Sequence, residues 1–241
     1  MKVAVTSSSF AALLRRGELT HLEWLEQCAS RLDVDGVVFA LADFPRTDKE
    51  YAAQLKKVAT DLGIVPVALE VPGLLDPERS ETEGTEAVAL AVAIGAGLIR
   101  VTAGSPGDLP PETFARTVAA TKALASAAKA ANVTLTVAPA AGSLFADLAD
   151  VQKFSKYVDS AWLRYDLPAG SPERAQLGAR DRVLVERFGF DEDPQLAQTP
   201  RRGWLVLEGN AGDDPFGRAG AAIAAIRKLG QRPQMPSVVP G

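Results

Sequence analysis

The feature of this sequence that most constrains its fold is a strand-and-helix unit repeated along the chain. Short runs rich in Val, Ile and Leu alternate with longer segments in which apolar residues recur at helical spacing. Three helical segments are expected to start at a capping box, a Thr or Ser followed three residues later by Glu. These pairs are Thr20 with Glu23, Thr47 with Glu50, and Ser80 with Glu83. Such alternation predicts a parallel sheet whose strands are joined by helices.

Eight strands are expected, and the segments between them are mostly helical. The strands cover residues 2–6, 35–41, 64–70, 97–102, 134–138, 161–165, 182–188 and 203–208, and helices are expected within residues 20–32, 47–62, 80–94, 111–131, 144–158 and 216–229. Only a brief helical turn is expected around residues 172–177, and residues 189–202 lack helical periodicity. The sequence therefore predicts an α/β protein with a single (β/α)8 TIM barrel over residues 1–231 and reduced sixth and seventh helical units. Residues 232–241 form a proline-rich tail.

The main alternative to a closed barrel is an open, doubly wound sheet. A nucleotide-binding sheet of that kind carries a glycine-rich phosphate turn after its first strand. Here the corresponding residues 7–10 read Ser-Ser-Ser-Phe, which we expect to form a polar loop, and neither a G-x-G-x-x-G nor a Walker pattern occurs. The missing turn favours the closed barrel.

Composition narrows the class of protein further. A length of 241 residues suits one barrel, and a net charge of −4 gives no reason to expect nucleic acid or a membrane as partner. No apolar run reaches membrane-spanning length without charges, and the chain opens directly on a strand with no charged leader. We therefore expect a soluble, cytoplasmic protein. The single cysteine, Cys28, falls in an apolar helical pattern and is interpreted as a core thiol.

Four segments of the chain share a pattern with one known family. They are residues 3–10, 20–39, 93–104 and 203–208, and the most specific parts are the Ile-Arg-Val-Thr-Ala-Gly stretch from Ile99 and the closing Glu208. In these parts the chain resembles the xylose isomerase-like TIM barrels, the sugar phosphate isomerase/epimerase superfamily. The resemblance implies isomerisation or epimerisation of a sugar or related polyol. It also implies a divalent cation that polarises substrate oxygens and a carboxylate that moves a proton between neighbouring carbons.

The resemblance further implies where such a cation would bind. The family ligands are a Glu after strand five, an Asp after strand six, a His on strand seven and a Glu after strand eight. Glu208 matches the last of these, and Asp166 falls within a residue or two of the second. Ala138 stands at the position of the first ligand and Glu186 at that of the histidine. The chain is thus interpreted as a divergent member with most metal ligands missing, which holds either no metal or a weakly bound Mg²⁺ or Mn²⁺.

Alternation along each strand separates side chains that face the barrel interior from those that face the helices. Near the strand ends, the predicted inward set comprises Glu70, Asp166, Glu186 and Glu208 with Arg100 and Arg164. A register shift of one residue on strand seven would exchange Glu186 for Arg187. Thr102, Trp204 and Asn210 complete the predicted contacts with a small molecule, and Trp204 is expected to point into the barrel and fill its floor.

Charges inside a barrel are costly unless they are paired or coordinated, and three interpretations of this set are open. In the first, Arg100 and Arg164 form a salt-bridge network with the carboxylates. In the second, Asp166, Glu186 and Glu208 are oxygen ligands of Mg²⁺ or Mn²⁺. In the third, the mouth is a pocket for an anionic or polyhydroxylated molecule, and the two arginines bind phosphate or carboxylate.

Two classes of function are consistent with these residues. If the protein is an isomerase, Glu208, Glu70 and Asp166 are the candidate catalytic residues, with Glu208 as the retained ligand or base. The alternative is a non-catalytic barrel, a pseudoenzyme with a salt-bridged mouth, that binds a small molecule or a protein partner. The missing ligand after strand five and the missing histidine favour this alternative slightly.

Overall fold

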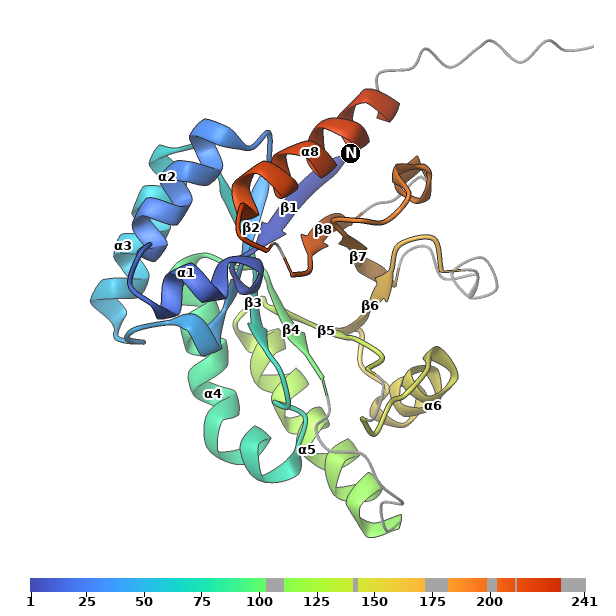
Figure 1. The fold of residues 1–241 in the computed structure, drawn as a ribbon. Coiled ribbons are helices and arrows are strands. Elements are labelled where there is room, and N and C mark those ends of the chain that lie inside the picture. Colours follow the sequence, from blue (N-terminus) through green and yellow to red (C-terminus); the bar gives the residue numbers. More distant parts are fainter. Residues whose placement is uncertain (103–110, 141–142, 172–181, 199–202, 211, 231–241) are drawn as a thin grey trace, which may run out of the picture.

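The computed structural model describes residues 1–102, 111–140, 143–171, 182–198, 203–210 and 212–230. Eight parallel strands close into one barrel in sequence order, with helices around the outside (Figure 1). The strands are β1 (Lys2–Thr6), β2 (Gly36–Ala40), β3 (Val65–Val71), β4 (Leu98–Val101), β5 (Thr134–Val137), β6 (Leu163–Pro168), β7 (Val183–Gly189) and β8 (Trp204–Glu208). Pairing of β8 with β1 closes the sheet. The predicted TIM barrel is confirmed.

All six expected helices are present. They are α2 (His21–Arg31), α3 (Lys49–Asp61), α4 (Pro77–Ile94), α5 (Pro111–Ala130), α6 (Leu148–Val158) and α8 (Pro215–Gly230). Between β7 and β8 the described residues contain only the short 3-10 turn η3 (Pro194–Gln198), so the reduced seventh unit is confirmed. The helical turn expected around residues 172–177 and the tail over 232–241 lie outside the described residues. Within those limits, no helix is both long enough and apolar enough to span a membrane.

The segment after β1 differs from the expected polar loop. It folds into the 3-10 turn η1 (Ser7–Phe10), a short helix α1 (Ala11–Arg15) follows, and a further 3-10 turn, η2 (Leu41–Asp43), follows β2. Thr6 caps η1, because its side-chain oxygen accepts a hydrogen bond from Ser8 N at 3.3 Å. Phe10 anchors the turn in the core. A serine-rich run thus becomes helical where one buried aromatic side chain fixes it.

The helix starts show how local chemistry sets the boundaries. The capping box of Thr20 and Glu23 is confirmed by reciprocal hydrogen bonds of 3.2 and 2.8 Å. The other two predicted boxes are wrong. Asp48 caps α3 instead of Thr47, since aspartate is an equally good N-cap. In α4 the first helical residue is Pro77, so Ser80 already lies in the first turn; proline is well suited to that first position.

Apolar side chains form two layers. The larger layer lies between the strands and the helices and includes Cys28, whose pKa is raised by burial, so the interpretation of this residue as a core thiol is confirmed. The smaller layer fills the barrel interior and consists of Ala4, Val38, Val67, Ala68, Val185 and Val206, with Leu98 and Trp204 packed against it. This plug fills the lower part of the barrel, below the C-terminal strand ends where barrels of this kind place their chemistry.

Candidate functional site

A single guanidinium group occupies the centre of the barrel mouth. Arg100 of β4 is 5% exposed, and each of its three nitrogens binds a different carboxylate. Nε lies 2.7 Å from Asp166 Oδ2, Nη1 lies 2.8 Å from Glu70 Oε2, and Nη2 lies 2.8 Å from Glu208 Oε2. These carboxylates come from β6, β3 and β8. One side chain therefore joins four strands by charge-assisted hydrogen bonds.

Strand register explains why Arg100 points inward. Leu98 and Arg100 face the barrel interior, and the alternate residues Ile99 and Val101 belong to the layer beneath the helices. Arg100 pairs in register with Glu70 on the neighbouring strand β3. The predicted salt-bridge network is confirmed for Arg100.

A second guanidinium, that of Arg187 on β7, completes the charged cluster. Its Nε lies 3.1 Å from Asp166 Oδ1 and its Nη1 lies 3.9 Å from Glu208 Oε1. The Nη2 group donates a hydrogen bond of 3.3 Å to the carbonyl of Pro139. Asp166 is fully buried, with one oxygen facing each arginine. It is thus the carboxylate most enclosed by positive charge.

The prediction that Glu186 faces the mouth is wrong. Pairing between β6 and β7 shifts by one residue, because Tyr165 pairs with Val183 whereas Asp166 pairs with Val185. This irregularity turns Val185 and Arg187 towards the barrel interior. Glu186 is buried on the opposite face of the sheet. The exchange places a positive charge where the sequence pattern predicted a negative one.

The prediction that Arg164 joins the network is also wrong. It faces inward, but β6 begins only at Leu163, so Arg164 lies at the N-terminal end of the barrel, roughly 7 Å along the strand before Asp166. There it lines a separate cavity of about 500 Å³ beside Arg182. Burial and the neighbouring Arg182 lower the pKa of Arg164, and no carboxylate among the described residues forms an ion pair with it.

The other predicted ligand contacts divide between the two ends of the barrel. Trp204 lies at the start of β8, roughly 13 Å before Glu208, with Lys2 Nζ 5.2 Å from its ring centre. Its predicted place in the floor is confirmed, and its predicted contact with a ligand stays a prediction. Thr102 lies at the mouth and its hydroxyl accepts a hydrogen bond of 3.0 Å from Gly73 N. Asn210 is exposed, just after Glu208.

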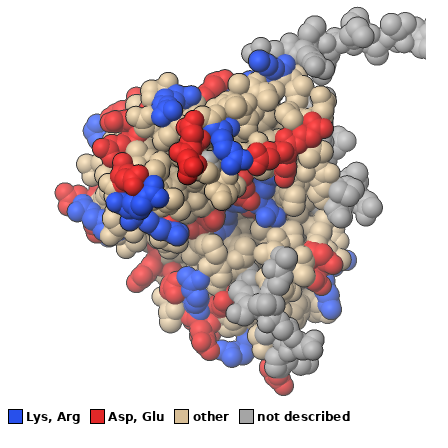
Figure 2. Space-filling model, viewed as in Figure 1, with Lys and Arg blue, Asp and Glu red and all other residues tan. Residues whose placement is uncertain are grey.

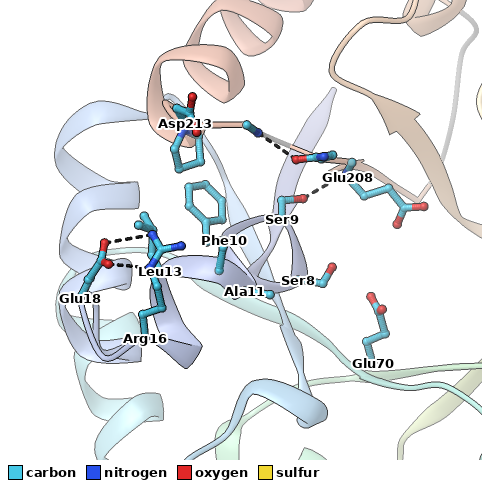
Figure 3. A pocket seen from close by; sticks show the side chains of 15 residues that line it. Ser8, Ser9, Phe10, Ala11, Leu13, Arg16, Glu18, Glu70, Glu208 and Asp213 are labelled. Carbon is cyan, nitrogen blue, oxygen red and sulfur yellow. Dashed lines mark hydrogen bonds and ion pairs between the residues drawn. The ribbon is translucent and has the colours of Figure 1, made fainter.

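A cavity of about 850 Å³ opens above the cluster, between the segments that follow β1 and β8. Its wall includes Ser8, Ser9, Glu70, Glu208, Asn210 and Asp213. Figure 3 shows Ser8, Glu70 and Glu208 directed towards one common space. The two segments are joined where Gly209 N donates to Ser9 Oγ at 3.2 Å. Sequence reasoning missed the first segment; the only signal was a run of serines at the C-terminal end of a strand.

Two pKa shifts describe the electrostatics of the mouth. Burial raises the pKa of Glu70; Arg100 opposes this effect, and Glu208 and Asp166 reinforce it. Burial alone would lower the pKa of Arg100, but the carboxylates of Asp166, Glu208 and Glu70 outweigh it and raise the pKa. Arg100 therefore stays charged, and Glu70 accepts a proton more readily than an ordinary glutamate.

The observed residues do not fit a divalent cation. The predicted ligand set of Asp166, Glu186 and Glu208 does not assemble, because Glu186 lies on the other face of β7. In the part of the chain that the structure describes, no three His, Cys, Asp or Glu side chains are arranged to hold a metal ion. The carboxylates of the mouth surround the Arg100 guanidinium instead.

Comparison with known proteins identifies the family. Residues 27–167 match the sequence profile of the xylose isomerase-like TIM barrels. The chain belongs to this family. The chain departs from the family's metal ligands at Ala138 and Glu186. In agreement with this, the described residues contain no group of side chains that could hold a metal. No curated protein matches the sequence.

Several solved structures have a similar fold over nearly the whole chain. The probable 3-DHS dehydratase AsbF from Bacillus anthracis is 13% identical with a TM-score of 0.73, covering 96% of this chain and 100% of its own. An L-ribulose 3-epimerase is 16% identical with a TM-score of 0.68, covering 98% and 100%. A D-psicose 3-epimerase from Clostridium cellulolyticum is 16% identical with a TM-score of 0.71, covering 95% and 99%. At these identities the likeness shows a shared fold.

Proposed function

We propose that the barrel mouth binds an uncharged polyhydroxylated small molecule, such as a sugar, without a divalent cation. The observation that carries this proposal is the cavity of about 850 Å³ with carboxylates in its wall. Glu70 and Glu208 each bind Arg100 through Oε2, and Glu208 Oε1 lies 3.9 Å from Arg187 Nη1, beyond hydrogen-bond distance. The Oε1 atoms can therefore accept hydrogen bonds from hydroxyl groups. The hydroxyl of Ser8 and the amide of Asn210 add donors at the same cavity.

Charge in the cavity favours a neutral ligand over an anionic one. All three nitrogens of Arg100 are engaged by carboxylates, so this arginine is not available to a phosphate. The only arginine in the cavity wall is Arg16, among the described residues, and it already binds Glu18 through two nitrogens at 2.5 and 3.1 Å. The outer surface seen in Figure 2 carries acidic and basic side chains intermixed, without an extended basic field that would attract an anion.

The test is a binding panel of neutral sugars and polyols together with their phosphate esters, measured by calorimetry in the presence of a chelator. We expect at least one neutral compound to bind and its phosphate ester to bind at least about tenfold more weakly, a difference of about 1.4 kcal/mol. Glu70→Gln and Glu208→Gln should both weaken binding, whereas Glu26→Gln on the exposed face of α2 should not. Equal binding by all three variants, or tighter binding of the ester, contradicts the proposal.

A second candidate function, a metal-independent isomerase or epimerase, rests on two glutamates in the wall of the same cavity, one of them with a raised pKa. Glu70, whose pKa is raised by burial, and Glu208 share the Arg100 guanidinium, and two neighbouring carboxyl groups of this kind can serve as an acid–base pair. In such a reaction Glu208 would take a proton from a carbon next to a carbonyl group, and protonated Glu70 would return one. The names of the epimerases with the same fold agree with this class of reaction.

Exchange of solvent deuterium into a bound ketose distinguishes the two candidates. Exchange that is lost in both Glu70→Gln and Glu208→Gln supports the enzyme. Sugar binding without exchange at any carbon supports a binding barrel, the non-catalytic alternative. Because a chelator is present throughout, exchange catalysed by a contaminating metal enzyme is removed.

A further inference from the structure

Three carboxylates from three different strands surround one guanidinium group at the mouth. Glu70, Asp166 and Glu208 each place one oxygen within 2.7–2.8 Å of an Arg100 nitrogen. Carboxylate oxygens are the ligands that a hard divalent cation prefers. Here the cation at their centre is a side chain of the protein itself.

Arg100 has little freedom to leave this position. It is a strand residue whose inward direction is fixed by pairing with β3 on one side and β5 on the other. Its side chain is 6% exposed, so it cannot turn to solvent without breaking all three hydrogen bonds. A guanidinium keeps its charge even when buried, which makes it a permanent cation.

The charge of the cluster also opposes an added ion. The three carboxylates face two guanidinium groups, those of Arg100 and Arg187, which gives a formal sum of −3 + 2 = −1. A divalent ion added to this cluster would reverse the sign. It would also compete with Arg187 for the remaining oxygens of Asp166 and Glu208.

We infer that Arg100 is the resident cation of this barrel and occupies the position that a divalent ion would take between Glu70, Asp166 and Glu208. Arg100 is thus a positioning residue that fixes the three carboxylates. The ion and the guanidinium exclude each other, so removal of the guanidinium converts the cluster into a site for a hard divalent cation. This inference does not rest on the proposed sugar binding.

The experiment is a titration with Mn²⁺ alone, followed by electron paramagnetic resonance of the free ion, on the full chain. Arg100→Ala should bind one Mn²⁺ per chain at least about 100-fold more tightly than the wild-type protein, because the ion no longer has to displace a buried partner. Arg187→Ala is the matched control: it removes the other guanidinium but leaves Arg100 in place, so it should gain no site. Adding Glu208→Gln to Arg100→Ala should weaken the new site at least about tenfold.

Several outcomes would overturn the inference. The inference fails if wild-type protein binds Mn²⁺ as tightly as Arg100→Ala does and Glu208→Gln abolishes that binding. The ion and the arginine would then coexist at the cluster. A folded Arg100→Ala protein without a new site shows that the carboxylates do not converge as described. If Arg100→Ala does not fold, Arg100→Gln takes its place, since its amide still bonds to carboxylates. If neither variant folds, the melting temperature of wild-type protein decides: a rise with Mn²⁺ that Glu208→Gln abolishes overturns the inference, and no rise supports it. All these readouts use the metal alone, so a failure to bind sugars leaves them unaffected.

Discussion

Replacing Asp166 by asparagine changes one oxygen into an amide nitrogen at the centre of the charged cluster. The side chain keeps its shape, but both guanidinium groups that face it lose one of their partner charges. Arg100 Nε at 2.7 Å and Arg187 Nε at 3.1 Å approach opposite oxygens, so the new amide group must point its own donors at one of them. Asp166 is fully buried, and water cannot replace the missing charge.

The magnitude follows from the burial of the pair. Breaking a buried ion pair from one side costs about 3–5 kcal/mol, because the remaining charge is left uncompensated. For a chain of this size the loss corresponds to a fall in melting temperature of about 6–20 °C. Glu208→Gln should cost less, about 1–2 kcal/mol, since its side chain is 28% exposed and solvent screens the change.

Equilibrium unfolding in urea, followed by tryptophan fluorescence and circular dichroism, measures both variants against the wild-type protein. Glu26→Gln on the outer face of α2 serves as control and should stay within about 0.5 kcal/mol of wild type. The expected order of destabilisation is Asp166→Asn, then Glu208→Gln, then the control. Equal midpoints for Asp166→Asn and the control, or a larger cost for Glu208→Gln, would refute the network.

Three further predictions concern single groups. Burial raises the pKa of Glu70 above 4.5, so folding stability falls as pH rises through the raised pKa. In Glu70→Gln, urea midpoints measured across pH should no longer show this fall. A pH profile identical to that of wild type contradicts the raised pKa. Burial lowers the pKa of His21 from 6.5 to about 4, so stability falls by up to about 3 kcal/mol as pH drops through that window. His21→Phe should remove this acid-side loss, and its persistence would assign the loss to other groups. The Cys28 thiol is buried with a raised pKa and should react with a thiol reagent only after unfolding; rapid reaction of the folded protein contradicts the packing.

The barrel could be predicted from the sequence because its signal repeats. Each strand is a short apolar run, and most runs are followed by a helical pattern. An error at one boundary therefore does not change the number of strands that is predicted. Arg100 could be predicted for the same reason. β4 pairs regularly with both neighbours, so simple alternation places Leu98 and Arg100 on the inner face. Local pattern and tertiary structure agree at this strand.

The errors in the predicted site come from positions that the local pattern does not determine. Arg164 alternates correctly, but its height in the barrel depends on where β6 begins, and helix α6 with the turn after it moves that start to Leu163. Ser8 and Ser9 reach the cavity because buried Phe10 holds η1 and α1 over the mouth. Both facts depend on packing against distant residues, which no short sequence window contains.

The irregularity between β6 and β7 has the largest chemical consequence. With Glu186 and Arg164 facing the mouth, the predicted cluster had four carboxylates and two arginines, a formal sum of −2 that a divalent cation would neutralise. The shift between Tyr165 and Asp166 instead directs Arg187 inward, and with Arg164 at the other end the sum is −1, with both cations already paired to carboxylates. A one-residue irregularity leaves the barrel intact, because inward and outward side chains still alternate along β7 when Val185 and Arg187 face inward in place of their neighbours. The same irregularity therefore determines the net charge of the mouth, and with it whether a divalent cation is needed to neutralise the carboxylates. Fold and chemistry therefore separate at this strand: the fold requires only alternation, whereas the chemistry depends on which register the alternation takes.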